Sequence, residues 1–225
     1  MLNQWSYSRL TAYEQCPQKV KFKVIDKLPD PAGPAADRGT YWHSVLEKYV
    51  GPARLDLPDP VPGGPDLSLF VPQLQELRDR NAQVERQVAF NTLWQPVAFF
   101  ASDAWGRMVF DVQYYDEPSY TVHTIDYKTG KTSATHANQL DLYAAVGYLL
   151  YPEAKLSVSE NWYLDLGPQA KLPRAMNKAA STHVLKRWEN AAQKMALDAE
   201  FKPRPGQHCR WCAFAKSKGG VCLFG

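Results

Sequence analysis

The sequence lacks any apolar segment long enough to cross a membrane. Its longest nearly apolar run covers residues 143–151, whereas a membrane helix needs roughly 18 residues. The opening segment, Met1 to Trp5, also lacks the basic-then-apolar pattern of a secretion signal. We therefore expect a cytoplasmic protein, in a bacterium or a virus-infected host cell, with no membrane partner.

Neither sign of charge dominates, because 26 Lys and Arg residues face 23 Asp and Glu residues for a net charge of +3. This balance permits a polyanionic partner without demanding one. The chain has no internal repeat and no Gly-x-x-x-x-Gly-Lys phosphate loop, so a motor that hydrolyses nucleotides is not expected. Its 225 residues, 45% of them hydrophobic, exclude a disordered chain and a disulfide-stapled miniprotein.

Cysteine is scarce and unevenly placed, with Cys16 alone near one end and Cys209, Cys212 and Cys222 near the other. Disulfides are rare in cytosolic proteins, so this distribution favours a metal site. The spacing Cys209-x-x-Cys212 lets two thiolates bind one centre. Zinc and an iron–sulfur cluster both fit that spacing, and His208 could replace one thiolate at a zinc ion.

Hydrophobic periodicity predicts an α/β chain that forms one domain over residues 1–225. A helix capped by Ser8 should break at Pro17. The Pro- and Gly-rich segment 52–72 is interpreted as a surface loop insertion, not as a domain boundary. The remaining expected helices cover residues 39–50, 73–80, 137–150 and 177–199, and the expected strands cover residues 84–91, 97–102, 108–115, 121–127 and 161–166.

Two aspartates and a lysine lie in the central strand region. Alternation along a strand puts Asp126 and Lys128 on one face, and Asp111 of the preceding strand can lie beside them in a hairpin. Two carboxylates about 4 Å apart repel each other by roughly 4 kcal/mol at an effective dielectric constant near 20. A divalent cation relieves that repulsion, and Mg²⁺ or Mn²⁺ prefers such oxygen ligands.

An Asp followed about 15 residues later by Asp-x-Lys and a Gly turn resembles the signature of the PD-(D/E)XK nuclease superfamily. Asp111 matches its first acid, Asp126 its second acid and Lys128 its lysine. No proline precedes Asp111, although one is common in the superfamily. The resemblance implies a restriction-endonuclease-like mixed sheet flanked by helices.

Further motifs resemble the RecB- and AddB-type and CRISPR-associated nucleases of this superfamily. The segment Gly39-Thr-Tyr-Trp-His43 is similar to their first helical motif, in which the histidine reaches the catalytic metal. Gln139-Leu-Asp-Leu-Tyr143 matches their Gln-x-x-x-Tyr motif, which implies a role in positioning the lysine or the substrate. By residue type alone, His43 would be a half-buried structural histidine, and Glu85 is equally well a further site carboxylate or a solvated strand end.

The two ends of the chain also match this group. Residues 6–17, Ser-Tyr-Ser-Arg-Leu-Thr-Ala-Tyr-Glu-Gln-Cys-Pro, look like the opening of these nucleases. Cys209, Cys212 and Cys222 match the tail that binds a four-iron four-sulfur cluster together with a distant cysteine, here Cys16. The resemblance therefore implies that residues 203–225 and the first helix are joined by such a cluster, and it favours this cluster over zinc.

The resemblance implies a Mg²⁺- or Mn²⁺-dependent exonuclease that acts on DNA ends or single strands in recombination, repair or viral DNA metabolism. His43, Asp111, Asp126 and the carbonyl of Tyr127 would hold the metal, while Lys128 would position water. A helicase or recombination protein is a conceivable partner. Two alternatives stay open: a non-catalytic DNA-binding module with a structural zinc or iron–sulfur site, and a zinc-stapled interaction protein.

Overall fold

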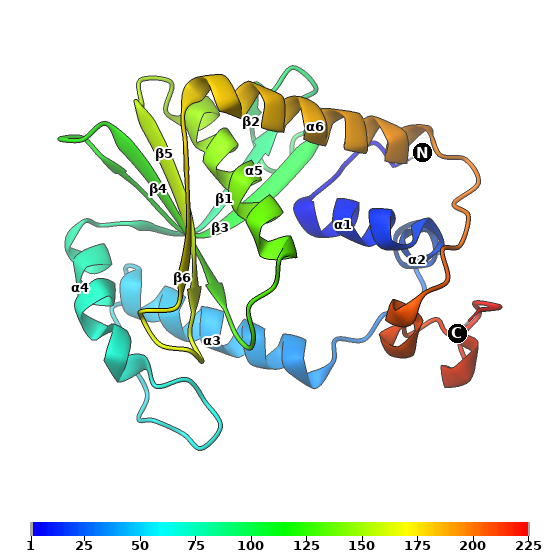
Figure 1. Cartoon of the computed structure of the whole chain (residues 1–225), viewed down its shortest axis with the longest axis horizontal. Coiled ribbons are helices and arrows are strands. Elements are labelled where there is room, and N and C mark those ends of the chain that lie inside the picture. The colour runs from blue at the N-terminus through cyan, green and yellow to red at the C-terminus, as the bar shows by residue number, and fades with distance from the viewer. Residues whose placement is uncertain (1, 225) are drawn as a thin grey trace.

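The computed structural model describes residues 2–224 and has a six-stranded mixed sheet at its centre, with helices on both faces (Figure 1). The expected mixed α/β architecture is confirmed. The strand order is β2-β1-β3-β4-β5-β6. The strands are β1 (Gln83–Phe90), β2 (Pro96–Val97), β3 (Gly106–Asp116), β4 (Thr121–Lys128), β5 (Leu156–Tyr163) and β6 (Lys171–Met176).

All neighbouring strands are antiparallel except β4 and β5, which are parallel. A parallel pair needs a long crossover, and the helix α5 (Thr135–Leu150) provides it. The other helical segments are α1 (Tyr7–Gln15), α2 (Pro17–Val20), the π-helical turn η1 (Lys21–Ile25), α3 (Pro34–Val50), the 3₁₀ turn η2 (Leu67–Phe70), α4 (Val71–Asp79), α6 (Lys178–Leu197), and the 3₁₀ turns η3 (Gln207–Trp211) and η4 (Lys216–Lys218).

Each face of the sheet has its own apolar core. On one face, Phe110 packs with Leu142 of α5 and Trp188 of α6. On the other face, α3 and α4 bury side chains such as Leu46 against Val112, Tyr127 and other strand residues. The sheet is therefore enclosed between α5 and α6 on one side and α3 and α4 on the other.

Phe110 and Val112 lie two residues apart on β3, yet they belong to different cores. Side chains two apart on a regular strand share a face, so the alternation of β3 breaks at Asp111. The same happens on β1, where Val84 packs with the second core and Val88 with the first. The two paired strands thus change face at the same level of the sheet.

Several expected boundaries near the N-terminus were wrong. The side chain of Ser6, not that of Ser8, accepts the Arg9 amide and caps α1. Helix α3 begins at Pro34, five residues before the expected start at residue 39, because proline suits the first turn of a helix. At the end of the expected loop, η2 buries Leu67 and Phe70 in the second core.

The strand predictions were also incomplete. The strand expected over residues 97–102 is limited to Pro96–Val97, and turns follow it. The strand expected over residues 161–166 covers Leu156–Tyr163 instead. Strand β6 was not expected, because Lys171–Met176 has no apolar alternation and owes its conformation to antiparallel pairing with β5.

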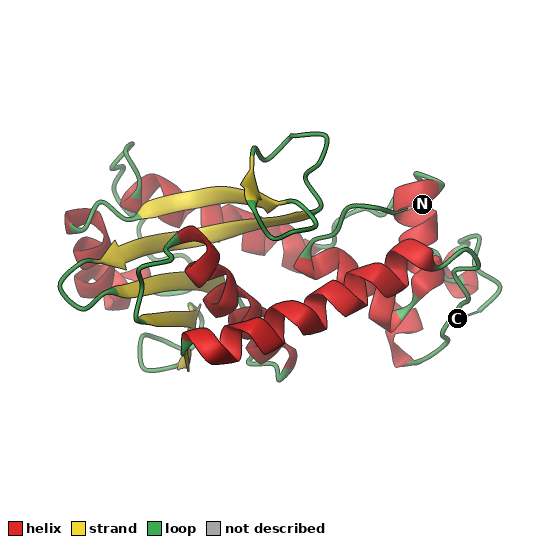
Figure 2. Ribbon diagram, turned by 90° about the horizontal axis from the view of Figure 1, so that it is seen from above, coloured by secondary structure: helices red, strands yellow, loops and turns green. Residues whose placement is uncertain are grey.

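The N-terminal helices and the C-terminal segment lie side by side at one end of the molecule (Figure 2). Phe22 packs edge to face on Phe214, with ring centroids 5.4 Å apart, and Arg204 Nη1 donates to the Glu14 carbonyl at 2.7 Å. These contacts bring Cys16 close to the other cysteines. Within residues 2–224, no helix is both long enough and apolar enough to cross a bilayer.

Candidate active site

His43 and Asp111 meet at the edge of the β3–β4 ladder. That ladder ends at the pair Val112 and Ile125, so Asp111 lies one residue beyond it. The Tyr127 amide donates to Asp111 Oδ2 at 2.6 Å. From α3, His43 places Nδ1 3.1 Å from Asp111 Oδ1 and Nε2 2.9 Å from the Tyr127 carbonyl oxygen. The strand end thus holds an imidazole, a carboxylate and a carbonyl together.

Glu85 joins this group from the neighbouring strand β1. The register pairs Val84 with Val112 and Arg86 with Phe110, which puts Glu85 opposite Asp111. Its backbone φ of +46° is in the left-handed region, which side chains other than glycine rarely adopt. Ligand atoms of His43, Glu85 and Asp111 all lie within 4.8 Å of one another. This is the one group of at least three potential ligands with that spacing within residues 2–224.

The charges of the triad suit a cation. Both ring nitrogens of His43 face oxygen acceptors, so only protons or a cation can satisfy both contacts. Burial lowers the pKa of His43, but the hydrogen bond and the charge of Asp111 outweigh it and the pKa is raised. Burial and the Asp111 charge raise the pKa of Glu85. A cavity of about 460 Å³ opens the triad to solvent. These residues fit a divalent metal ion.

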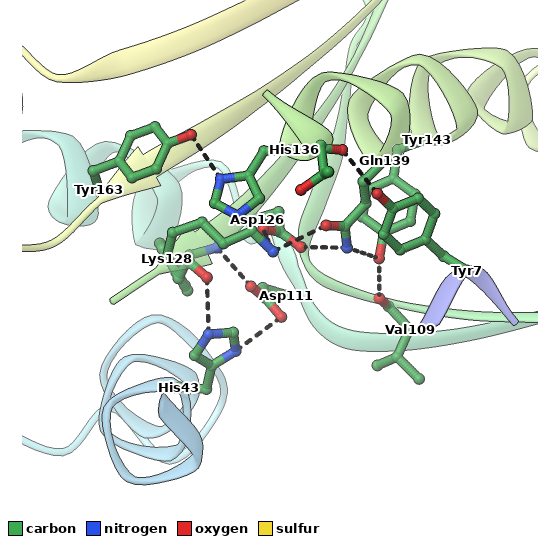
Figure 3. A network of polar contacts seen from close by, with 12 residues as sticks. Tyr7, His43, Val109, Asp111, Asp126, Lys128, His136, Gln139, Tyr143 and Tyr163 are labelled. Atoms are coloured by element: carbon green, nitrogen blue, oxygen red, sulfur yellow. Dashed lines mark hydrogen bonds and ion pairs between the residues drawn. The ribbon is translucent and has the colours of Figure 1, made fainter. Parts of the chain in front are cut away.

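Asp126 and Lys128 lie on the α5 side of β4 and form an ion pair of 2.6 Å (Figure 3). Gln139 of α5 bridges them, because its Oε1 accepts from Lys128 Nζ at 2.9 Å and its Nε2 donates to Asp126 Oδ1 at 3.0 Å. Gln139 Nε2 also donates to Tyr143 Oη at 2.9 Å. The Tyr143 hydroxyl in turn donates to the Val109 carbonyl at 3.3 Å. The lysine ammonium is therefore held at a fixed position.

The carboxyl of Asp126 is buried, with only 5% of the residue exposed. Burial and then the charge of Asp111 raise its pKa to about 6, against the opposing pull of Lys128 and His43. An acid with such a pKa beside a lysine and a second acid is typical of a functional site. The protonation of Asp126 therefore depends on the charges of His43 and Asp111.

The structure brings together most residues that the sequence singled out for catalysis. His43, Asp111 and the Tyr127 carbonyl are in mutual contact, and Asp126, Lys128, Gln139 and Tyr143 form a second connected network. Asp126 does not belong to the compact triad, whereas Glu85 does. Sequence reasoning left Glu85 undecided because its place opposite Asp111 depends on the β1–β3 register.

Cys16 and the three cysteines near the other end of the chain line one small cavity between the α2–η1 segment and the C-terminal segment. The Gly206 amide donates to Cys209 Sγ at 3.5 Å, and Cys222 Sγ donates to Gln18 Oε1 at 3.3 Å. Across residues 2–224, no three cysteine sulfurs lie within 4.8 Å of one another. The sulfurs are therefore gathered at one place but not in contact as a compact group.

Comparisons with known proteins identify a sequence family and a solved structure with a similar fold. A family model described as the PD-(D/E)XK nuclease superfamily matches residues 4–114 and 111–217. No curated protein is significantly similar to the chain in sequence. The crystal structure of a protein named "Putative exonuclease" from Eubacterium rectale is similar, with a TM-score of 0.54 and 10% identity over 99% of this chain and 90% of that chain.

A second solved structure, titled "Crystal structure of SSO0001", has a TM-score of 0.40 and 14% sequence identity over 94% of this chain and 84% of that chain. The likeness to the Eubacterium rectale protein shows a shared fold. The family match covers both the triad and the Asp126–Lys128 network.

Proposed function

The chain belongs to the PD-(D/E)XK nuclease superfamily, and we propose that it is a Mg²⁺- or Mn²⁺-dependent deoxyribonuclease that degrades DNA from its ends. The observation that carries this proposal is the triad of His43, Glu85 and Asp111, with ligand atoms within 4.8 Å, beside the Asp126–Lys128 ion pair. Carboxylates that can hold a divalent cation next to a fixed ammonium suit phosphodiester hydrolysis, because the cation and the ammonium stabilise the negative charge that develops on the phosphate in the transition state.

In this proposal His43, Asp111, Asp126 and the Tyr127 carbonyl hold the metal ion, and Glu85 is a further ligand. When bound, the ion would lower the pKa of a water molecule and stabilise the negative charge on the phosphate. The oxygen-rich ligand set favours Mg²⁺ or Mn²⁺ over softer metals. The raised pKa values of Glu85 and Asp126 support this assignment, because both carboxylates lie in surroundings that a cation would relieve.

Lys128 is proposed to position the attacking water. The water oxygen forms a bond to phosphorus, one phosphorus–oxygen bond to the sugar breaks, and the departing oxygen receives a proton. Gln139 is a positioning residue in this proposal, since it contacts both Lys128 and Asp126. The Tyr143 hydroxyl accepts a second hydrogen bond from Gln139 Nε2, the nitrogen that also donates to Asp126, and thereby helps to hold the amide in place.

The cysteine cavity is proposed to hold a four-iron four-sulfur cluster that joins the first helices to residues 203–225 within one nuclease domain of the RecB/AddB type. All four cysteines line this one cavity, which supports a shared metal centre, and the resemblance to the RecB/AddB-type nucleases favours the cluster over zinc. The cluster would act as a structural staple. Closing a loop of nearly the whole chain costs roughly 5 kcal/mol in entropy, and a cross-link between the two ends removes that cost from folding because it also restricts the unfolded chain.

The proposed substrate is cytoplasmic DNA with free ends or single-stranded regions, in recombination, repair or viral DNA metabolism. The sequence contains no phosphate loop. Unwinding of duplex DNA would therefore depend on a partner such as a helicase. The competing proposal, a DNA-binding module without catalysis, requires no intact triad, so the charges gathered at Asp111 argue against it.

End-labelled single-stranded and duplex DNA, with free or blocked ends, will test the proposal in the presence of Mg²⁺, Mn²⁺ or EDTA. We expect digestion that needs the metal and a free end. Equal digestion of closed circles and linear DNA would contradict action at ends. No digestion of any polynucleotide, with DNA binding retained, would favour the non-catalytic module.

A further inference from the structure

An aromatic pair lies at the turn after β2, on the loop that leads to β3. Phe99 and Phe100 pack edge to face with ring centroids 5.1 Å apart, and Phe100 is 80% exposed. Isolated exposed apolar side chains are common on protein surfaces. This pair is different because the guanidinium of Arg107 lies 5.6 Å from the Phe99 centroid and 5.9 Å from the Phe100 centroid.

The Arg107 side chain has no acidic partner. Within residues 2–224 no carboxylate lies within ion-pair distance of its guanidinium, and its buried Nε has no hydrogen-bond acceptor. A second arginine, Arg9, lies near enough that burial and the Arg107 charge lower its pKa. Arg9 lines a different cavity together with Asp103, so Arg107 is the cation that remains available here for an anionic ligand.

A cavity of about 350 Å³ connects this place to the proposed catalytic residues. Phe99 and Arg107 line it at one side, and Gln139 and Tyr143 line it at the other. Val109 lines both this cavity and the one that contains His43 and Asp111. A bound chain that passes along Val109 therefore runs from the aromatic pair to the triad.

We propose that this cavity, together with the exposed Phe100 ring that packs on its lining residue Phe99, binds an unpaired nucleotide of the DNA strand to be cut, with the phosphate at Arg107 and the base stacked on Phe100. The proposal rests on the proposed nuclease function and adds a preference for single-stranded DNA. An exposed ring accepts any base, since every base offers a π face. Arg107 suits the phosphate because guanidinium geometry matches phosphate oxygens and permits stacking on aromatic rings. A blunt duplex end, whose bases are paired and stacked, offers Phe100 no free base.

Fluorescence anisotropy in EDTA, which prevents cleavage, will compare binding of a labelled single-stranded oligonucleotide and a blunt duplex of equal length. We expect the parent protein to bind the single strand more tightly. Phe100→Ala should weaken single-strand binding by about tenfold, with a smaller effect on the duplex. Phe100→Trp should restore most of the binding because it keeps a stacking surface. Leu93→Ala, at a 74% exposed position in the turn between β1 and β2, is the control and should bind like the parent.

A fluorescent base analogue, 2-aminopurine, placed along the single strand will report stacking directly. We expect quenching at one position in the parent and its loss in Phe100→Ala. Arg107→Gln should weaken binding and reduce its dependence on salt concentration, because one phosphate contact is lost.

Three outcomes would overturn this inference. If the parent digests DNA but Phe100→Ala binds single strands as tightly as the parent, the inference fails while the proposed function stands. If Phe100→Ala weakens duplex and single-strand binding equally, the ring does not stack on an unpaired base. If the parent neither binds nor digests DNA, the proposed function and the inference both fail.

Discussion

At the residue scale, His43 and Asp111 each contact more than one polar group of the site. Asp111 occupies the point where β3 and β4 separate, so its carboxylate can accept the Tyr127 amide and face His43 at the same time. Glu85 adds a second negative charge opposite Asp111. The protein therefore accumulates acceptors at one point, which costs stability unless a cation binds there.

The first prediction concerns Glu85. Its pKa is raised in the folded protein, so its charged form opposes folding at neutral pH, and this cost disappears as the pH falls and the group is protonated. Glu85→Gln removes the charge, and we expect a higher melting temperature in EDTA. The same change should reduce both the stabilisation by added Mg²⁺ and the rate of DNA cleavage. Thermal unfolding in EDTA and with Mg²⁺ measures the two effects on stability, and digestion of labelled DNA measures the cleavage rate.

Glu47→Gln is the matched control, because Glu47 lines the same cavity but lies outside the triad. It should change the response to Mg²⁺ less than Glu85→Gln does. An unchanged Mg²⁺ response in Glu85→Gln would exclude Glu85 as a ligand.

The second prediction concerns Gln139, which holds Lys128 and Asp126 in place. Gln139→Leu keeps a similar volume but removes the hydrogen bonds to Lys128, Asp126 and Tyr143. We expect kcat to fall by about 10- to 100-fold with little change in KM, because the interaction orients reacting groups more than it binds substrate. Asn138→Leu, an exposed neighbour on the same helix, should be near the parent. A rise in KM with unchanged kcat would assign Gln139 to substrate binding instead.

At the element scale, α5 matters because it carries Gln139 and Tyr143 over the sheet. It approaches the strands closely at Gly147, where an added Cβ would clash with the Ser157 hydroxyl and lie 3.2 Å from Val122 Cγ1. The Ser157 hydroxyl is buried and has no hydrogen-bond partner. Close packing of α5 therefore depends on a glycine facing a small side chain.

The third prediction uses this contact. Gly147→Ala should lower the free energy of unfolding by about 1–3 kcal/mol, the usual cost of overpacking, although alanine favours helix more than glycine does. Most of that loss should disappear when Gly147→Ala is combined with Ser157→Ala. Urea unfolding of the two single variants and the double variant measures the coupling. Additive effects would mean that the helix shifts to accept the methyl group.

At the scale of the whole molecule, the two ends of the chain depend on one another. Tyr13 of α1 donates to Asp198 Oδ2 at 2.7 Å, and Phe22 packs on Phe214. The four cysteines lie within the same assembly of N-terminal helices and C-terminal turns. A metal centre at that point would connect residues nearly 200 positions apart and restrict the unfolded chain strongly.

The fourth prediction concerns this centre. Purified protein should contain iron and absorb near 400 nm, and Cys16→Ser should lose both properties. We expect its free energy of unfolding to fall by about 5 kcal/mol, the order of the entropy cost of closing a loop of this length. Gln15→Ser, at the adjacent exposed position, is the control. Bound zinc without absorbance near 400 nm would contradict the iron–sulfur assignment while keeping the staple.

The sequence by itself determined the helix and strand content of most segments and the residue types at the site. Hydrophobic periodicity is a local property, and the Asp111, Asp126 and Lys128 signature also lies within a short stretch of chain, so both could be predicted. The predicted helix around residues 137–150 agrees closely with α5. Gln139 and Tyr143 were predicted from their resemblance to the Gln-x-x-x-Tyr motif, and their four-residue spacing puts them on one face of that helix.

Only the tertiary structure decided which distant residues meet. Glu85 joins the site through the register between β1 and β3 and through its left-handed backbone, and no pattern near residue 85 encodes either feature. Strand β6, the cavity that gathers the cysteines and the adjoining cavities from Phe99 to Asp111 likewise depend on contacts between distant segments. A sequence pattern reports the propensities of neighbouring residues, whereas these contacts follow from packing the whole chain into one minimum of free energy.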